Sequence, residues 1–120
     1  MDAFLAGLRA HYGEAAVATR TVPGQLLVSV AGVHIPRRNG TTTDALVALP
    51  LDFRTSGARP QVYFKPGTTQ PNGRPGRNVN PTMVHGESWL SMSWQFDWAP
   101  TMPAWALVEG AVRRFTVNED

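Results

Sequence analysis

Side chains that could perform chemistry gather in the stretch from Asn80 to Asp97. Ser88 is a potential nucleophile, His85 a potential base, and Glu87 or Asp97 a potential orienting acid. A serine nucleophile works only when a base, itself held by a third group, removes its proton. Closeness in the sequence does not establish that geometry. An enzyme that uses His85, Ser88 and Asp97 is therefore the least favoured of three hypotheses, and we assign no catalytic residue.

Cysteine is absent from the 120 residues. Its absence excludes disulfides, zinc–thiolate sites and cysteine nucleophiles together. The three histidines, His11, His34 and His85, show no spacing typical of metal ligands. We expect no metal site and no cofactor.

The composition is that of one packed domain over residues 1–120, because 42% of the residues are hydrophobic and 17% are charged. Apolar runs stay shorter than the roughly 18 residues that would span a bilayer. The N-terminus lacks the basic start and continuous apolar region of a signal peptide. We therefore expect a cytoplasmic protein with no membrane partner.

The N-terminal half alternates between helical and strand patterns. Phe4, Leu5, Leu8 and Tyr12 share one face of a helix that Asp2 could cap and Gly13 could end. Residues 15–21 and 25–35 are predicted strands joined by a turn at Pro23-Gly24. The second strand is apolar on both sides, so we expect both of its faces to be covered.

The C-terminal half continues with two more strands, a loop and a helix. An Asn-Gly hairpin connection at 37–40 leads to a strand over 41–49, and a short strand covers 61–65. Residues 66–80 contain three Pro and three Gly and are predicted to form a long irregular loop. Residues 104–115 place Trp105, Val108, Val112 and Phe115 along one helix face. The predicted class is α+β: an N-terminal helix, a four-stranded antiparallel meander, the loop and a C-terminal crossing helix.

All four tryptophans lie between residues 80 and 107. Trp and Met at this density bury a large area per residue, so the stretch is either a core seam or a recognition surface. Trp94 and Phe96 alternate with Gln95 and Asp97, which favours packing of the two aromatic residues. Trp98 with Pro100 is predicted to be structural.

Three motifs resemble the ubiquitin-conjugating-enzyme family in their order and spacing. Residues 45–64, ALVALPLDFRTSGARPQVYF, are similar to its two strands with a proline-bounded link. Asn80-Pro81-Thr82 stands where the family has His-Pro-Asn. The third motif runs from Gly86-Glu87-Ser88-Trp89-Leu90 through Trp98-Ala99-Pro100 to a helix. It resembles the family's Gly-x-x-Cys-Leu, its Trp-x-Pro and its crossing helix, in that order. The resemblance covers residues 1–116 and implies that family's fold.

The departures from the family bear on function. Trp89 stands where the family has its nucleophilic cysteine, Thr82 where it has Asn, and Asn80 where it has His. Ubiquitin transfer requires a thiolate that forms a thioester. The two C-terminal helices of active members also have no counterpart. The chain thus resembles catalytically inactive members and the short conjugating-enzyme-like proteins of bacterial operons.

A basic segment offers an alternative function. Residues 54–77 carry Arg54, Arg59, Lys65, Arg74 and Arg77, and no acid. With Tyr63 and Phe64 nearby, this segment could follow a phosphate backbone and stack on bases. The other interpretation is a solvent-exposed loop whose basic side chains have no binding role.

The leading hypothesis is a non-catalytic binding or adaptor protein for a ubiquitin-like modifier, its activating enzyme or a peptidase. A nucleic-acid or acidic-ligand binding module is the second. In the leading hypothesis Trp89 anchors the partner, because Trp is favoured at the centres of protein interfaces. The alternative is that Trp89 only fills the space of the lost active site. The residues predicted to contact a partner are Trp89, His85, Ser88, Asn80, Arg74 and Arg77.

Overall fold

The computed structural model describes residues 2–36, 41–52, 60–74, 79–92 and 101–116. Its elements follow in the order α1 (Asp2–Tyr12), η1 (Glu14–Ala16), β1 (Val17–Val22), β2 (Gln25–His34), β3 (Thr42–Pro50), β4 (Gln61–Phe64), β5 (Val79–Val84), β6 (Glu87–Met92), α3 (Ala104–Val112) and η2 (Arg113–Phe115). The hairpin connection expected at 37–40, and Trp94, Phe96, Asp97 and Trp98, lie outside the described residues.

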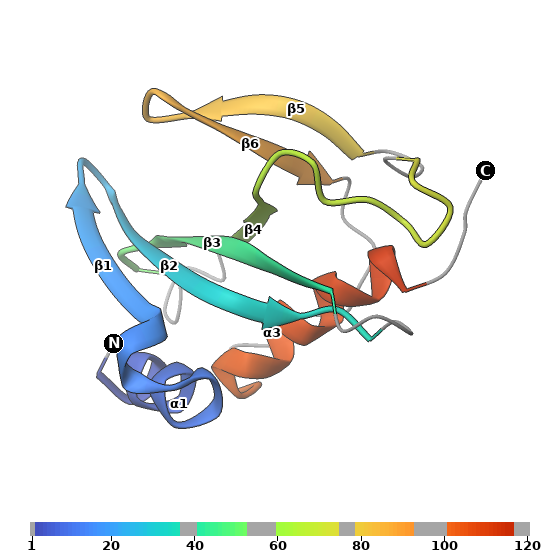
Figure 1. The fold of residues 1–120 in the computed structure, drawn as a ribbon. Helices are drawn as coiled ribbons and strands as arrows, with labels where there is room; N and C mark the ends of the chain where they lie inside the picture. Colours follow the sequence, from blue (N-terminus) through green and yellow to red (C-terminus); the bar gives the residue numbers. More distant parts are fainter. Residues whose placement is uncertain (1, 37–40, 53–59, 75–78, 93–100, 117–120) are drawn as a thin grey trace.

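The strands form one six-stranded antiparallel sheet in the order β1-β2-β3-β4-β6-β5 (Figure 1). The α+β class and the four expected strands are confirmed, the latter as β1 to β4. The expected strand count of four is wrong, because residues 79–92 add the hairpin β5–β6. The predicted irregular loop accordingly ends where β5 begins, at Val79.

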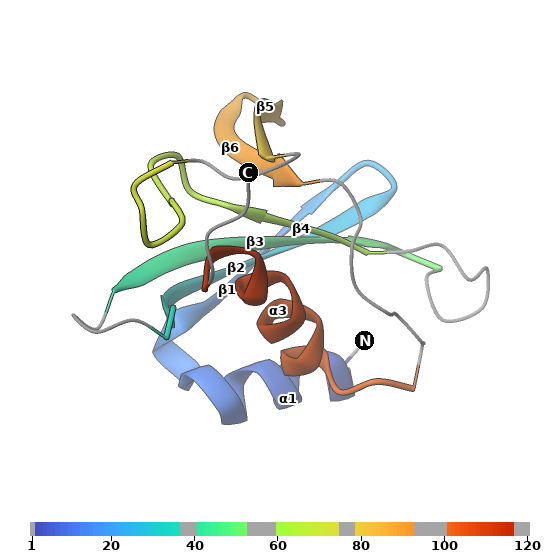
Figure 2. The ribbon, with the colours of Figure 1, turned by 90° about the vertical axis from the view of Figure 1, so that its right-hand side faces the viewer.

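Both helices lie on the same face of the sheet (Figure 2). In α1, Phe4 and Leu8 are buried, and Gly13 follows with a φ of +101° while its N–H bonds to the carbonyl of Arg9. A positive φ favours glycine, so the helix ends there as predicted. No helix among the described residues combines the length and apolar character needed to cross a bilayer.

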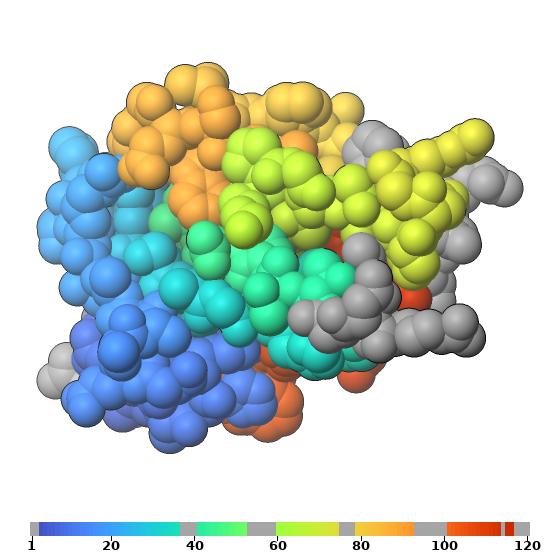
Figure 3. Space-filling model, viewed as in Figure 1, coloured from blue at the N-terminus to red at the C-terminus, as the bar shows by residue number. Residues whose placement is uncertain are grey.

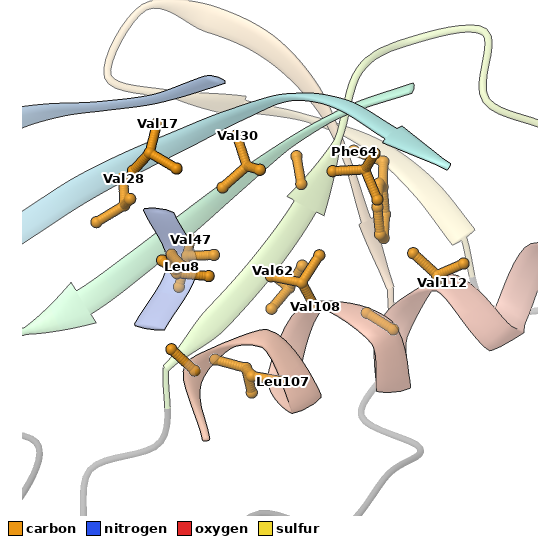
Figure 4. Close-up of a cluster of buried hydrophobic side chains, with 14 of the residues drawn as sticks. Leu8, Val17, Val28, Val30, Val47, Val62, Phe64, Leu107, Val108 and Val112 are labelled. Atoms are coloured by element: carbon orange, nitrogen blue, oxygen red, sulfur yellow. The ribbon is translucent and has the colours of Figure 1, made fainter. Parts of the chain in front are cut away.

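The main core lies between the helices and this face (Figure 4). In α3 the buried positions recur at helical spacing, which the amphipathic pattern predicted: Ala104, Leu107, Val108, Ala111 and Val112. Trp105 is a correction to that pattern, because it is 39% exposed and stacks on His11. Phe115 of η2 meets Phe64 of β4 edge to face, with ring centroids 5.2 Å apart.

A β-bulge shifts the phase of β2. Before it, Val28 and Val30 face the helices; after it, Val33 and Ile35 do so. Gly32 adopts a φ of +69° at the bulge, and its N–H donates to Oδ1 of Asp44 at 3.1 Å. Without the extra residue, Gly32 and His34 would face the core instead. The bulge therefore keeps the core of β2 apolar along its length.

The other face of the sheet is covered where the hairpin β5–β6 folds over it. Leu27, Leu46 and Ala48 of the sheet cluster there with Val84, and Trp89 packs against them. The expectation that β2 is covered on both faces is thus confirmed around Leu27. In Figure 3 the orange β6 rests against the blue and cyan strands β1 and β2.

The hairpin β5–β6 turns at His85 and Gly86, whose φ values are +47° and +86°. The flanking pair is Val84↔Glu87, so the connection is a two-residue turn of the kind that suits twisted strands. Pro81 is tolerated because β5 is the edge strand of the sheet. The register places Thr82 opposite Trp89 and Met83 opposite Ser88.

The turn yields a stability prediction. Replacing His85 by Val should lower the free energy of unfolding by about 1–2 kcal/mol, because a β-branched residue tolerates positive φ poorly. Replacing it by Asn should be neutral or stabilising. Urea unfolding would measure both changes. Ser88→Val, in the extended backbone of β6, is the control and should stay within about 0.5 kcal/mol. Equal stability of the two Val variants would contradict the assignment of strain to the turn.

Candidate functional site

The hairpin and the sheet enclose a groove with a volume of about 210 Å³. Alternation along β6 turns Glu87 and Trp89 towards the sheet, and Ala18 and Arg20 of β1 face them from the floor. Strands far apart in the sheet order therefore build one site. Its lining residues are Ala18, Thr19, Arg20, Leu27, Ser29, Leu46, Glu87 and Trp89.

The indole of Trp89 forms one wall of the groove. The side chain is half-buried, and its ring packs on the cluster around Leu27 and Leu46. Its Nε1 atom is buried and has no hydrogen-bond partner among the residues that the structure describes. An indole N–H can only donate, and a buried donor without an acceptor costs about 1–3 kcal/mol. This is a polar group for which a ligand could supply the missing acceptor.

One ion pair lies at the groove. Nη2 of Arg20 is 3.2 Å from Oε1 of Glu87, and the two side chains are 52% and 56% exposed. An exposed pair of this kind stabilises a protein by only about 0–1 kcal/mol. It joins β1 to the hairpin and places one positive and one negative group beside the Trp89 wall.

The predicted serine-nucleophile arrangement is not formed by the residues that the structure describes. The Ser88 hydroxyl donates to Sδ of Met83 at 3.4 Å, on the side of β6 opposite Trp89. His85 is exposed at the turn, where its Nε2 lies 3.4 Å from Oε1 of Gln25. The base and the nucleophile are thus directed at different partners, and Asp97 lies outside the described residues.

The other predicted contact residues lie apart from the groove. Asn80 is exposed on β5, and its carbonyl accepts a hydrogen bond from the Ser91 hydroxyl at 3.3 Å. Arg74 is exposed in the stretch after β4, and Arg77 lies outside the described residues. Of the predicted contact residues that the structure describes, Trp89 alone lines the groove.

In the described part of the basic segment, one of the two rings expected to stack on bases is buried. Lys65 and Arg74 are exposed, but the Phe64 ring is fully buried in the core and cannot stack on a base. Tyr63 is half-buried, and that burial raises the pKa of its hydroxyl. Arg54 and Arg59 fall outside the described residues.

Sequence reasoning missed most of the groove, because its floor belongs to β1 and β2. The signal was present in the two-residue spacing of Ala18 and Arg20, and of Leu27 and Ser29, which places each pair on one face of its strand. Only the folding of residues 79–92 over these strands could reveal that they face Trp89. Among the described residues, no three His, Asp or Glu side chains gather into a potential metal site.

A second hollow, of about 410 Å³, lies between α1 and the start of α3. The rings of His11 and Trp105 stack at its side, 4.9 Å apart and 6° from parallel. Next to them the Tyr12 hydroxyl donates to Oε2 of Glu109. Burial, the hydrogen bond to Glu109 and its negative charge raise the pKa of Tyr12 well above its usual range.

Tyr12 gives a prediction about alkaline stability. Because its pKa is higher in the folded protein, the folded state keeps the proton after the unfolded chain has lost it. Stability should therefore hold up to about pH 10, the usual pKa of tyrosine, and fall above it. Tyr12→Phe should reduce the loss of stability per pH unit above about pH 10. Part of the loss should remain, because the pKa of Tyr63 is also raised. Urea midpoints between about pH 8 and pH 11 measure the slope; identical slopes in both proteins would contradict the prediction.

Comparisons of the chain with protein-family models, with curated proteins and with solved structures find no match.

Proposed function

We propose that this chain is a non-catalytic domain of the ubiquitin-conjugating-enzyme type that binds a partner protein in a ubiquitin-like-modifier pathway. The order of elements supports this: a helix, an antiparallel sheet and a late helix on the same sheet face. The choice of a ubiquitin-like-modifier pathway comes from the motifs that resemble the family, at residues 45–64, 80–82, 86–90 and 98–100. The hairpin β5–β6 carries two of these motifs.

The observation that carries the proposal is the position and environment of Trp89. By the motif resemblance this residue corresponds to the family's nucleophile. It lines the groove, and its buried N–H has no partner in the described part of the chain. A residue that only filled space would satisfy or expose its polar atom. An indole with an unmet donor beside an ion pair is instead suited to anchor a partner.

The chain has no cysteine, so it cannot form a cysteine thioester. Ser88 does not replace it, because its hydroxyl is directed at Met83 rather than at His85. We therefore assign binding rather than transfer. Burial of Phe64 leaves the nucleic-acid alternative without a specific observation in its favour.

The test is a titration of the ¹⁵N-labelled chain with ubiquitin and a panel of ubiquitin-like proteins, followed by NMR. At least one should give saturable shifts that include the Trp89 indole N–H. Trp89→Leu, which keeps an apolar side chain on the Leu27 cluster, should weaken binding at least tenfold. Trp105→Leu, on the helix side of the molecule, is the matched control and should not.

A covalent assay completes this test. With an activating enzyme and ATP, no thioester should form on the chain, since it lacks the thiol. If no panel member binds, or if Trp89→Leu binds as tightly as the parent while remaining folded, the proposed function is wrong.

A further inference from the structure

The two edges of the sheet differ in how well they are protected against further strand pairing. The edge strands are β5 and β1, and β1 lies at the margin of the sheet in Figure 1. An exposed edge presents N–H and C=O groups that can pair with another chain. We propose that β1 pairs with β1 of a second copy of this chain, so that two sheets join across a two-fold axis at Thr19. This inference goes beyond the proposed function and does not depend on it.

The turn after β1 fixes which of its backbone groups point outward. Val22 and Gln25 flank the two-residue turn at Pro23-Gly24. In such a turn the C=O of the first residue accepts from the N–H of the fourth, so Val22 bonds to β2. Successive residues of an antiparallel strand bond alternately to one side and to the other. The residues of β1 whose backbone groups point away from β2 are therefore Val17, Thr19 and Thr21.

The opposite edge of the sheet is protected and β1 is not. Val84 and Glu87 flank the turn of the β5–β6 hairpin, so by the same alternation Pro81 directs its backbone away from β6. Proline has no N–H to offer a further strand. The sequence of β1, VATRTV, contains no proline and is rich in residues that favour strands. Its one charged residue, Arg20, is paired with Glu87. Pairing with a further strand is thus more favourable at β1.

The strand is complementary to itself in one antiparallel register. With Thr19 opposite Thr19 of the second copy, Val17 lies opposite Thr21, and all three outward residues pair. About six backbone hydrogen bonds form, two for each pair. A shift of two residues towards the turn sets Arg20 against Arg20, where like charges repel, and Val17 against Pro23, which has no N–H. A shift the other way runs past the start of the strand. Charge and hydrogen bonding therefore select the register centred on Thr19.

The helices leave room for this register. Val17, Thr19 and Thr21 share the sheet face on which Val17 joins the main core. Val17 is buried, whereas Thr19 and Thr21 are exposed, so α1 covers only the start of the strand. In the antiparallel pair, the covered start of one strand lies beside the open end of the other. The two copies of α1 are thus offset along the pair.

The first test is the dependence of association on concentration. One pair of six-residue strands is smaller than a standard interface, so the dimer should be weak and form at high concentration. Sedimentation velocity should show this rise. Thr19→Pro removes an outward N–H but no bond to β2, so it should weaken the dimer at least tenfold. Met83→Pro, at an outward position of β5, is the matched control and should leave the dimer unchanged. Circular dichroism shows whether each variant is folded.

The second test reports the register through a disulfide. The chain has no cysteine, so one introduced thiol can pair only with the same thiol of a second copy. Thr19→Cys sets the two Cα atoms about 5.5 Å apart, a distance that suits a disulfide. Thr21→Cys, another exposed threonine on the same face, sets them about 14 Å apart. Under a mild oxidant such as diamide, Thr19→Cys should cross-link at least ten times faster than Thr21→Cys.

Three results would overturn the proposal: a chain that stays monomeric up to millimolar concentration, equal cross-linking of the two Cys variants, or a folded Thr19→Pro variant that dimerises as the parent does. A monomer would favour an extended segment of a different protein as the strand that pairs with β1. The two proposals fail separately. Dimerisation without binding of any modifier would contradict the proposed function alone, and modifier binding by a strictly monomeric chain would contradict this inference alone.

Discussion

Replacing Phe64 by Ala is expected to lower the free energy of unfolding by about 3–5 kcal/mol, the cost typical of deleting a buried aromatic ring. The ring is 0% exposed and meets Phe115 edge to face at 5.2 Å. It also stands where the hairpin joins the sheet, at the register pair Phe64↔Leu90. The loss therefore affects strand pairing and helix packing together. Chemical unfolding, followed by circular dichroism, measures it.

Two controls separate ring packing from general sensitivity of β4. Phe64→Leu keeps most of the volume and should cost less than half as much. Tyr63→Phe alters the neighbouring side chain on the other sheet face and should cost about 1 kcal/mol or less. A double-mutant cycle between Phe64 and Phe115 should give a coupling of about 0.5–1.5 kcal/mol. A cost below about 1 kcal/mol for Phe64→Ala would contradict the buried contact.

Trp89→Ala should cost about 2 kcal/mol, less than a fully buried tryptophan because the side chain is half-buried. The loss comes from uncovering Leu27, Leu46 and Ala48 on the second face. Trp89→Phe should be nearly neutral, within about 1 kcal/mol, because it keeps an aromatic ring and removes a buried N–H that has no acceptor. Urea unfolding of both variants measures the difference.

Trp105→Ala is the comparison for this pair. Trp105 is more exposed and stacks on His11 at the edge of the helix layer, so its loss should cost about 1 kcal/mol. If Trp89→Phe were as damaging as Trp89→Ala, the indole nitrogen would have to make a hydrogen bond in the folded protein. That result would also remove the main support for the groove as a binding site.

Local patterns were enough to predict both helices, the strands β1 to β4 and the α+β class. Residues 2–12 repeat their apolar positions at helical spacing, and Gly13 ends the run. The same reasoning missed the hairpin β5–β6. Pro81 is unfavourable in the interior of a sheet, and His-Gly is a weaker turn signal than Asn-Gly. Both residues are tolerated because β5 is an edge strand and the turn is exposed.

The amino-acid sequence by itself determined that cysteine chemistry is excluded, because it contains no cysteine. Our proposal for Trp89 also began from the sequence, in the motif resemblance described above. Only the tertiary structure decided what surrounds that tryptophan. The partners Arg20 and Ser29 lie about 60 residues or more away in the chain, and no local period relates them to Trp89. They come together because the hairpin folds back over the sheet and buries an apolar cluster. The free energy gained by that burial depends on packing between segments far apart in the sequence.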